Sequence, residues 1–185
     1  MRVFLICGSV SEVSHTLGLL TALRQALESH GCQVDLWNLR LRPLPITDPQ
    51  FHYNPEDTPD ENVRAFVAAV RLADGLAIGT PLYHGSMSGV LKNALDHLKS
   101  DAFRHKPVAL LSHASEERRC TAACEHLMSV VRTLYGYATQ TQIGTTKSDY
   151  RRVEQAMVLN NAEILARIER QSSELVRMID QLGTP

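Results

Sequence analysis

A turn rich in hydroxyl groups follows the first apolar run of the chain. It reads Cys7-Gly8-Ser9-Val10-Ser11-Glu12-Val13-Ser14-His15-Thr16 and leads into a stretch of helical period. The first N–H groups of a helix have no intrahelical partners, and together with the positive end of the helix dipole they attract anions. An anion bound there could accept further hydrogen bonds from the hydroxyl groups of Ser9, Ser11, Ser14 and Thr16. The pattern predicts a monophosphate site, with simple helix capping by Ser14 or Thr16 as the alternative.

Two other phosphate-binding motifs can be excluded from the same residues. A dinucleotide fingerprint would read G-x-G-x-x-G, and a P-loop would end in Gly-Lys-Ser or Gly-Lys-Thr; neither is present. Asp35 stands about where a ribose-binding acid would follow a Rossmann loop, but Gly8 is the only glycine of the turn. We therefore interpret Asp35 as an ordinary strand residue.

The elements that must position this turn follow from the apolar pattern. Short runs of strand type alternate with longer stretches of helical period, which is typical of a parallel sheet with crossover helices. The predicted strands are Arg2 to Cys7, Gln33 to Leu39, Gly75 to Thr80, Pro107 to Ser112 and Tyr137 to Gln142. The predicted helices are Thr16 to Ser29, Glu61 to Leu72, Ser88 to Leu98, Arg118 to Leu134 and a long one from about Arg151 to Gln181.

These elements predict an α/β fold of flavodoxin-like type, with a doubly wound five-stranded parallel sheet in the order 2-1-3-4-5 and helices on both faces. The 185 residues are expected to form a single domain. In this fold ligands bind at the carboxyl ends of strands one, three and four. The segment from Arg42 to Pro59 holds five prolines and is expected to be a long surface loop.

The composition of the chain disfavours two classes of binding partner, nucleic acid and membranes. Nineteen Lys and Arg against twenty Asp and Glu give a net charge of −1, which disfavours nucleic acid and anionic membranes. No apolar stretch reaches the roughly 20 residues of a membrane-spanning helix. The four cysteines, Cys7, Cys32, Cys120 and Cys124, do not form a disulfide framework, so we expect free thiols and a cytoplasmic protein. A metal site at Cys120 and Cys124 is possible from their spacing but disfavoured.

The segment after the third strand carries a family resemblance. It reads T-P-L-Y-H-G-S-M-S-G-V-L-K-N-A-L-D from Thr80 to Asp96. This run resembles the signature P-x-Y-x-G-S-x-x-G-x-L-K-N-x-x-D of the NADPH-dependent FMN reductase family. The first turn is similar to that family's G-S-x-R-x-x-S, and the likeness extends over about residues 1 to 145.

The resemblance implies FMN as cofactor and NADPH or NADH as electron donor, with the chemistry carried by the flavin and no catalytic side chain. The first turn would hold the phosphate. The flavin ring would lie against Pro81, Leu82, Tyr83, His84, Gly85 and Ser86. Electrons would pass to a small acceptor, which could be a flavin, quinone, azo compound, nitro compound or metal oxyanion. Homodimers or homotetramers are expected by the same analogy.

Two departures from the family pattern bear on cofactor binding. The family's arginine in the first turn is replaced by Ser11, so FMN should be held less tightly unless His15 or another residue takes its place. Relatives have Gly-Gly after the fourth strand, where this chain has Ser112, His113 and then Ala114. Both changes leave open an alternative function, a non-catalytic flavodoxin-like electron-transfer or regulatory protein with weakened FMN binding.

Overall fold

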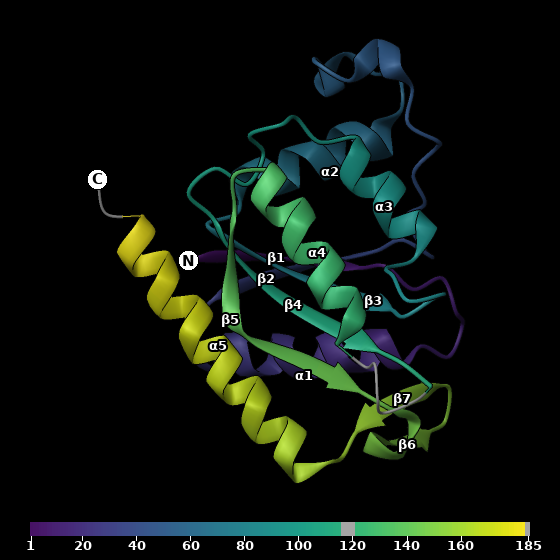
Figure 1. The fold of residues 1–185 in the computed structure, drawn as a ribbon, viewed down its shortest axis with the longest axis vertical. Coiled ribbons are helices and arrows are strands. Elements are labelled where there is room, and N and C mark those ends of the chain that lie inside the picture. Colours follow the sequence, from purple (N-terminus) through teal and green to yellow (C-terminus); the bar gives the residue numbers. More distant parts are fainter. Residues whose placement is uncertain (116–120, 184–185) are drawn as a thin grey trace.

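The computed structural model describes residues 1–115 and 121–183, and its centre is a parallel five-stranded sheet (Figure 1). The strands are β1 (Arg2–Cys7), β2 (Gln33–Asn38), β3 (Gly75–Pro81), β4 (Pro107–His113) and β5 (Tyr137–Thr145). Their order is β2-β1-β3-β4-β5, which confirms the predicted fold class. β4 and β5 each extend beyond the predicted ends, and β5 does so by three residues.

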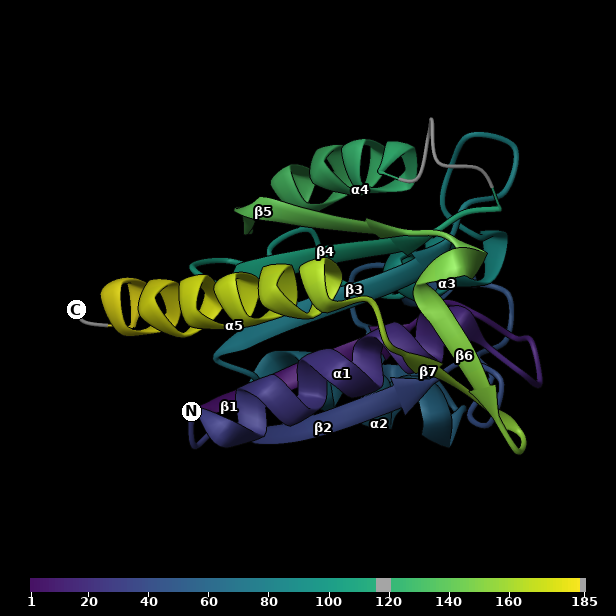
Figure 2. The ribbon, with the colours of Figure 1, turned by 90° about the horizontal axis from the view of Figure 1, so that it is seen from below.

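Helices cover both faces of the sheet, as Figure 2 shows with α1 and α5 in front of the strands. The helices are α1 (His15–Ser29), α2 (Glu61–Leu72), α3 (Gly89–Asp96), α4 (Ala122–Thr133) and α5 (Ala162–Leu182). The predicted start of α4 at Arg118 lies outside the described residues. Gly31 follows α1 with a φ of +78°, a left-handed conformation that is typical of a glycine after a helix.

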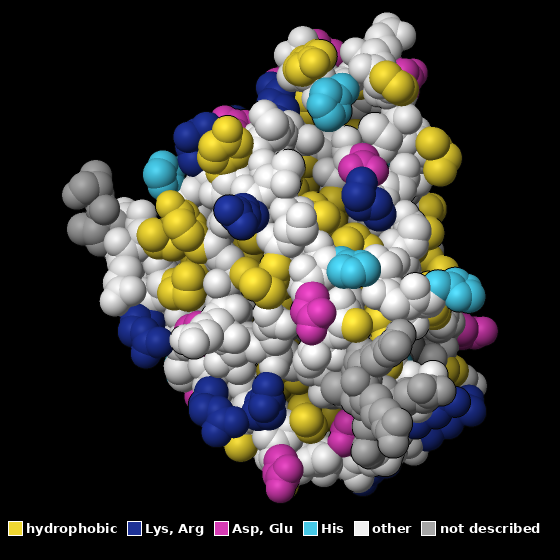
Figure 3. Space-filling view, in the orientation of Figure 1, with side chains coloured by type: hydrophobic (Ala, Val, Ile, Leu, Met, Phe, Trp, Pro, Cys, Tyr) yellow, Lys and Arg dark blue, Asp and Glu magenta, His cyan; other side chains and the backbone are white. Residues whose placement is uncertain are grey.

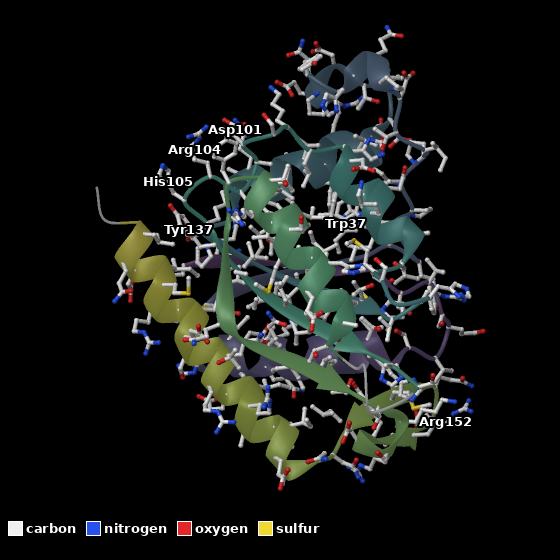
Figure 4. The ribbon with its side chains drawn as sticks, in the orientation of Figure 1. Trp37, Asp101, Arg104, His105, Tyr137 and Arg152 are labelled. Atoms are coloured by element: carbon white, nitrogen blue, oxygen red, sulfur yellow. The ribbon has the colours of Figure 1, made fainter. Side chains whose placement is uncertain are left out.

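Alternation along the strands divides the core into two layers. In β1, Val3 and Leu5 pack with α1 and α5 on one face, whereas Phe4 and Ile6 pack with α2, α3 and α4 on the other. Successive strand side chains point to opposite faces, so a strand buried on both sides is apolar throughout. Trp37, labelled in Figure 4, is buried in the second layer against Phe4 and Phe66.

The C-terminal region differs from the prediction of a long helix from about residue 151. Residues there form an antiparallel hairpin of β6 (Tyr150–Val153) and β7 (Ala156–Leu159), and α5 begins only at Ala162. Asn161 is the N-cap, and its side-chain oxygen accepts hydrogen bonds from the N–H groups of Glu163 and Ile164. The prediction failed because the apolar spacing before Asn161 was interpreted with a helical period.

The hairpin packs on α1 at a glycine. A Cβ placed on Gly18 would collide with the carbonyl oxygen of Met157 in β7. Because the obstacle is backbone, the collision can be relieved only if the hairpin moves away from α1. Gly18 therefore allows the close contact between α1 and the hairpin.

A Gly18→Ala variant should be destabilised by about 1–3 kcal/mol, the usual cost of overpacking. This sign is opposite to that of helix propensity, which favours Ala over Gly by about 1 kcal/mol. Gly89→Ala is the matched control, because a Cβ at that helical glycine meets nothing within 4 Å. Urea unfolding measures both, and a stabilised Gly18→Ala would contradict the packing of the hairpin on α1.

The segment from Arg42 to Pro59 is a long excursion, as predicted, but it contains two 3-10 turns at Pro49–Phe51 and Pro55–Asp57. Asn93 of α3 fastens it, accepting from the N–H of Thr47 at 2.9 Å and donating to the carbonyl oxygen of Pro45 at 2.7 Å. The side chain of Asn93 therefore has a structural role.

On the face drawn in Figure 3, side chains of both charges are interspersed with apolar ones. No helix in the described parts of the chain is long and apolar enough to span a membrane. Cys7 and Cys32 are buried free thiols, Cys124 is also buried, and Cys120, the other cysteine of the disfavoured metal pair, is outside the described residues.

Candidate functional site

A pocket of about 240 Å³ lies at the carboxyl ends of β1, β3 and β4, where this fold places its ligand. The first loop (residues 8–14) and the start of α1 form one side, and the second loop (Thr80–Ser88) forms the other. Nine predicted site residues line the pocket: Ser9, Ser11, Ser14, His15, Thr16, Pro81, Leu82, Tyr83 and His113. Val13 and Ser115 line it as well, and neither was predicted.

The first loop ends at a capped helix whose leading N–H groups are free. Ser14 is the N-cap of α1, and its hydroxyl oxygen accepts from the N–H of Leu17 at 3.1 Å. The N–H groups of His15 and Thr16 have no hydrogen-bond partner within residues 1–115 and 121–183. Capping by Ser14 therefore leaves two donors for a ligand, and the capping and phosphate-binding interpretations are compatible.

The second loop is closed at its ends and bonded to the first loop. The hydroxyl of Thr80 accepts from the N–H of Ser88 at 3.0 Å, and the hydroxyl of Ser88 donates to the carbonyl oxygen of Gly8 at 2.6 Å. Ser88 is also the N-cap of α3, accepting from the N–H of Leu91. One buried serine therefore caps a helix and joins the two loops that form the pocket.

The tip of the second loop is a tight turn that points away from the pocket. Tyr83 and Ser86 exchange two backbone hydrogen bonds of 2.9 and 3.0 Å, and His84 and Gly85 between them have φ values of +49° and +83°. Two positive φ values are typical of a type I′ turn, which explains the glycine. His84, Gly85 and Ser86 do not line the pocket, and the Ser86 hydroxyl is instead bonded to His126 of α4.

Ser112 also lies away from the pocket. Its side chain is fully buried beside Cys124 of α4, and its carbonyl oxygen accepts from the Thr145 hydroxyl at 3.2 Å. In a strand covered on both faces, the side chain before His113 must point to the opposite layer. Of the two predicted residues at the end of β4, the structure therefore brings only His113 to the pocket.

Two histidines stack at the pocket wall. The rings of His15 and His113 are parallel within 1°, with centroids 4.2 Å apart. The ring of Tyr150 stands edge-on to both, at 5.0 Å from His15 and 5.5 Å from His113. Tyr150 is the first residue of β6, just before the predicted helix start at about Arg151, and its contact with the two histidines was not predicted.

Burial and neighbouring charge keep both imidazoles neutral. Desolvation, with contributions from His15 and Lys147, lowers the pKa of His113 to about 4. Desolvation and Lys147 likewise lower the pKa of His15 below its usual value. Burial raises the pKa of Tyr150, whose hydroxyl is bonded to that of Thr145 at 2.8 Å. At neutral pH the two imidazoles and the phenol are therefore uncharged, and the charged side chains that act on them are Lys147 and Asp149.

Larger cavities lie elsewhere on the molecule. One cavity of about 500 Å³ lies between α2 and the segment 98–106, which includes Asp101 and Arg104. In Figure 4 these two residues are labelled at the opposite end of the molecule from Arg152, which belongs to the hairpin. That segment precedes β4, so this cavity opens at the amino ends of the strands. The smaller pocket is the better candidate because it lies at the topological switch point and holds convergent polar groups.

A Ser88→Ala variant should lose about 1–3 kcal/mol of stability, because it removes a helix cap and leaves the buried carbonyl oxygen of Gly8 without its donor. Ligand affinity at the pocket should fall as well, since the two loops are no longer joined. Ser129→Ala, which removes an exposed hydroxyl on α4 away from the joint, is the control. Urea unfolding and ligand titration measure the two effects, and unchanged values for Ser88→Ala would contradict the role of the joint.

Comparison with known proteins agrees with the geometry. The sequence matches the family model described as NADPH-dependent FMN reductase over residues 1–148. An FMN-dependent NADPH-azoreductase of Staphylococcus haemolyticus (strain JCSC1435) is 39% identical over 154 residues, which are 83% of this chain and 81% of that protein. Another of Staphylococcus aureus (strain USA300) is 34% identical over 181 residues, or 97% and 96% of the two chains.

Among solved structures, an oxidoreductase from Corynebacterium diphtheriae has the same fold, with a TM-score of 0.72 at 19% identity over 97% of each chain. The family resemblance carried by the run from Thr80 to Asp96 is thus confirmed by the family model and by relatives that match most of the chain. This chain belongs to the NADPH-dependent FMN reductase family and is an oxidoreductase that uses FMN and NADPH.

Proposed function

We propose that the pocket between the two loops holds FMN, and that this chain uses it to reduce azo compounds with NADPH. The observation that supports this site most strongly is the hydrogen bond from the Ser88 hydroxyl to the carbonyl oxygen of Gly8, which joins the two loops. Through this bond the second loop lies beside the capped start of α1, where two N–H groups have no partner among the described residues. The azo acceptor is supported by the two curated relatives, both FMN-dependent NADPH-azoreductases, one of which matches nearly the whole chain.

The donor set fits a phosphate ester. The N–H groups of His15 and Thr16 point out of the start of α1, and the hydroxyls of Ser9 and Ser11 lie on the same pocket wall. The volume of about 240 Å³ is below the roughly 300–1,000 Å³ of complete ligand sites. The pocket therefore suits the phosphate and ribityl end, with the flavin ring lying at its mouth.

The mouth of the pocket is built for a flat ring. Pro81 is buried and stiff at the end of β3, whereas the side chain of Tyr83 is 48% exposed. These residues give the ring an apolar wall on one side and leave the other side open to a planar partner. His113 adds a neutral imidazole at the polar edge of this wall.

FMN, when bound, accepts a hydride from NADPH and passes two electrons to the next acceptor. Cleavage of one azo bond to two amines takes four electrons and four protons, so it consumes two NADPH and two protons from solvent. The open side beside Tyr83 can receive the nicotinamide and the acceptor in turn. The side chains of this pocket are required to bind, orient and exclude water, and none has to act as a nucleophile.

The purified protein with FMN and NADPH should bleach an azo dye, with two NADPH oxidised for each dye molecule. A quinone, a nitroaromatic compound and free FMN are tested in parallel. Oxidation of NADPH with these acceptors but not with the dye would overturn the azo assignment alone. Absence of NADPH oxidation with every acceptor would overturn the enzymatic proposal and favour a non-catalytic flavodoxin-like protein.

A further inference from the structure

The first loop offers a phosphate no permanent positive charge. Between residues 8 and 16 there is no Lys or Arg, and the only ionisable side chains are Glu12 and His15. Arg40, from the segment after β2, donates to the carbonyl oxygen of Val10 at 3.2 Å and lies 4.0 Å from Glu12, so its charge is directed to the outer side of the loop. A dianionic phosphate at the start of α1 would therefore need its counter-charge from another group.

His15 stands where that charge is needed. It is the first residue of α1, its ring lines the pocket, and its backbone N–H is one of the two free donors. The ring is held from two sides, by the parallel ring of His113 at 4.2 Å and by the edge of Tyr150 at 5.0 Å. His15 is thus a fixed imidazole beside the expected phosphate position.

Among residues 1–115 and 121–183, Lys147 and Asp149 are the charged side chains that act on the histidine pair. Lys147 opposes protonation of both rings, and Asp149 acts on His113 in the opposite direction. The carboxylate of Asp149 is occupied by the N–H of Thr146 at 2.7 Å and the amide of Asn161 at 2.7 Å. Two imidazolium rings stacked at 4.2 Å would repel each other, so the pair can hold one positive charge and not two.

We propose that His15 takes up a proton when the FMN phosphate binds, and that His113 stays neutral and holds the His15 ring in position. The pair would thereby supply the positive charge that the loop lacks, and would supply it only in the complex. This inference rests on the proposed FMN site, and it adds to it that FMN affinity depends on pH. His15 is the binding residue and His113 a positioning residue.

The direction of the pH dependence follows from linkage. Without ligand, burial and Lys147 hold the pKa of His15 low, so the ring is neutral at pH 7. A phosphate dianion beside it favours the protonated ring and raises that pKa. Binding then takes up a proton, and affinity falls as pH rises, by at most about ten-fold per pH unit. Above pH 6.5 the phosphate is mostly dianionic, with its second pKa near about 6, so its own titration contributes little.

The test is a titration of the purified protein with FMN and with riboflavin between pH 6.5 and 8.0. The dissociation constant for FMN should rise roughly ten-fold over this range, and that for riboflavin, which has no phosphate, should stay constant. Calorimetry in buffers of different ionisation enthalpy should show uptake approaching one proton per FMN at pH 7. Neither readout depends on turnover.

Two matched variants test which of the two histidines takes up the proton. Both His15→Phe and His113→Phe keep a flat ring in the stack and remove one titrating group. His15→Phe should lose the pH dependence and bind FMN at pH 6.5 as weakly as the parent chain does at pH 8.0. His113→Phe should keep the pH dependence, because its own ring is the neutral partner.

The outcomes separate this inference from the proposed function. FMN binding that is constant with pH and takes up no proton would overturn the inference and leave the FMN site intact. Loss of the pH dependence in His113→Phe but not in His15→Phe would overturn the assignment to His15. Equal pH dependence for riboflavin would show that the phosphate is not the linked group. Absence of FMN binding at every pH would overturn the proposed site itself.

Discussion

A Gly8→Ala variant should bind FMN roughly 100-fold more weakly than the parent chain. A Cβ at Gly8 would lie 2.8 Å from the Cβ of Leu91 and 3.1 Å from the carbonyl oxygen of Gly79. Neither obstacle is the end of a flexible side chain, so the first loop must move away from α3. That movement would break the joint with Ser88 and displace the free N–H donors, and two lost charge-assisted hydrogen bonds of about 1.5 kcal/mol each correspond to this factor.

FMN titration by fluorescence measures the effect of Gly8→Ala, and Gly89→Ala is the control. Gly89 adjoins Ser88 at the same joint, but a Cβ there meets nothing within 4 Å. The control should bind as the parent chain does, and Gly8→Ala should also lose about 1–3 kcal/mol of stability. A Gly8→Ala chain that folds and binds FMN with unchanged affinity would show that the loop joint does not form the site.

A Ser11→Arg variant should bind FMN roughly ten-fold more tightly. Ser11 lines the pocket and is exposed, so the longer side chain can reach a phosphate without displacing the core. A guanidinium that makes a charge-assisted hydrogen bond in place of a neutral one adds about 1–1.5 kcal/mol. Because the new charge is permanent, the variant should also show a weaker dependence of FMN affinity on pH than the parent chain.

Ser11→Gln is the matched control, since it adds length and a hydrogen-bond donor but no charge. Its FMN affinity should stay within about two-fold of the parent value, and the gain of Ser11→Arg should shrink as salt is added. Riboflavin affinity should not change in either variant. Equal gains for FMN and riboflavin would mean that the arginine acts on the ring and that the phosphate lies elsewhere.

The sheet was predictable because each strand carries its own local signal. β1 from Val3 to Cys7 and β3 from Gly75 to Gly79 hold only apolar residues and glycine, as strands covered on both faces require, and each strand is followed by a glycine- or proline-bearing turn. Gly31 marked the end of α1 for a physical reason, since only glycine adopts its φ of +78° without strain. The strand order was then taken from the doubly wound fold that five strands with intervening helices fit.

The hairpin was not predictable in this way. Its strands are four residues long, and their burial depends on contact with α1 at Gly18 rather than on alternation within the segment. Tyr150 and Met157 fit a helical period equally well, so periodicity alone could not distinguish the two structures. The sequence did hold one signal for a later helix start, namely Asn161, a favourable N-cap residue that is followed two positions later by Glu163 in the first turn.

Both loops of the candidate pocket, and nine of the residues that line it, were predictable from the sequence, whereas the orientation of the other predicted residues was not. Residues of the second loop were grouped together because they are adjacent in sequence, but the turn at His84 and Gly85 directs its tip away from the pocket. Likewise, successive side chains of β4 point to opposite faces of the sheet, so Ser112 and His113 lie on different faces. The contact between His15 and Tyr150 joins residues 135 positions apart, and no local pattern indicates it.

The most direct measurement is a crystal structure of the protein with FMN. We expect the phosphate within hydrogen-bond distance of the N–H groups of His15 and Thr16, and the flavin ring against Pro81 and Tyr83. FMN bound in the cavity between α2 and residues 98–106, or a pocket that stays closed by His15 and His113 at saturating FMN, would contradict this expectation.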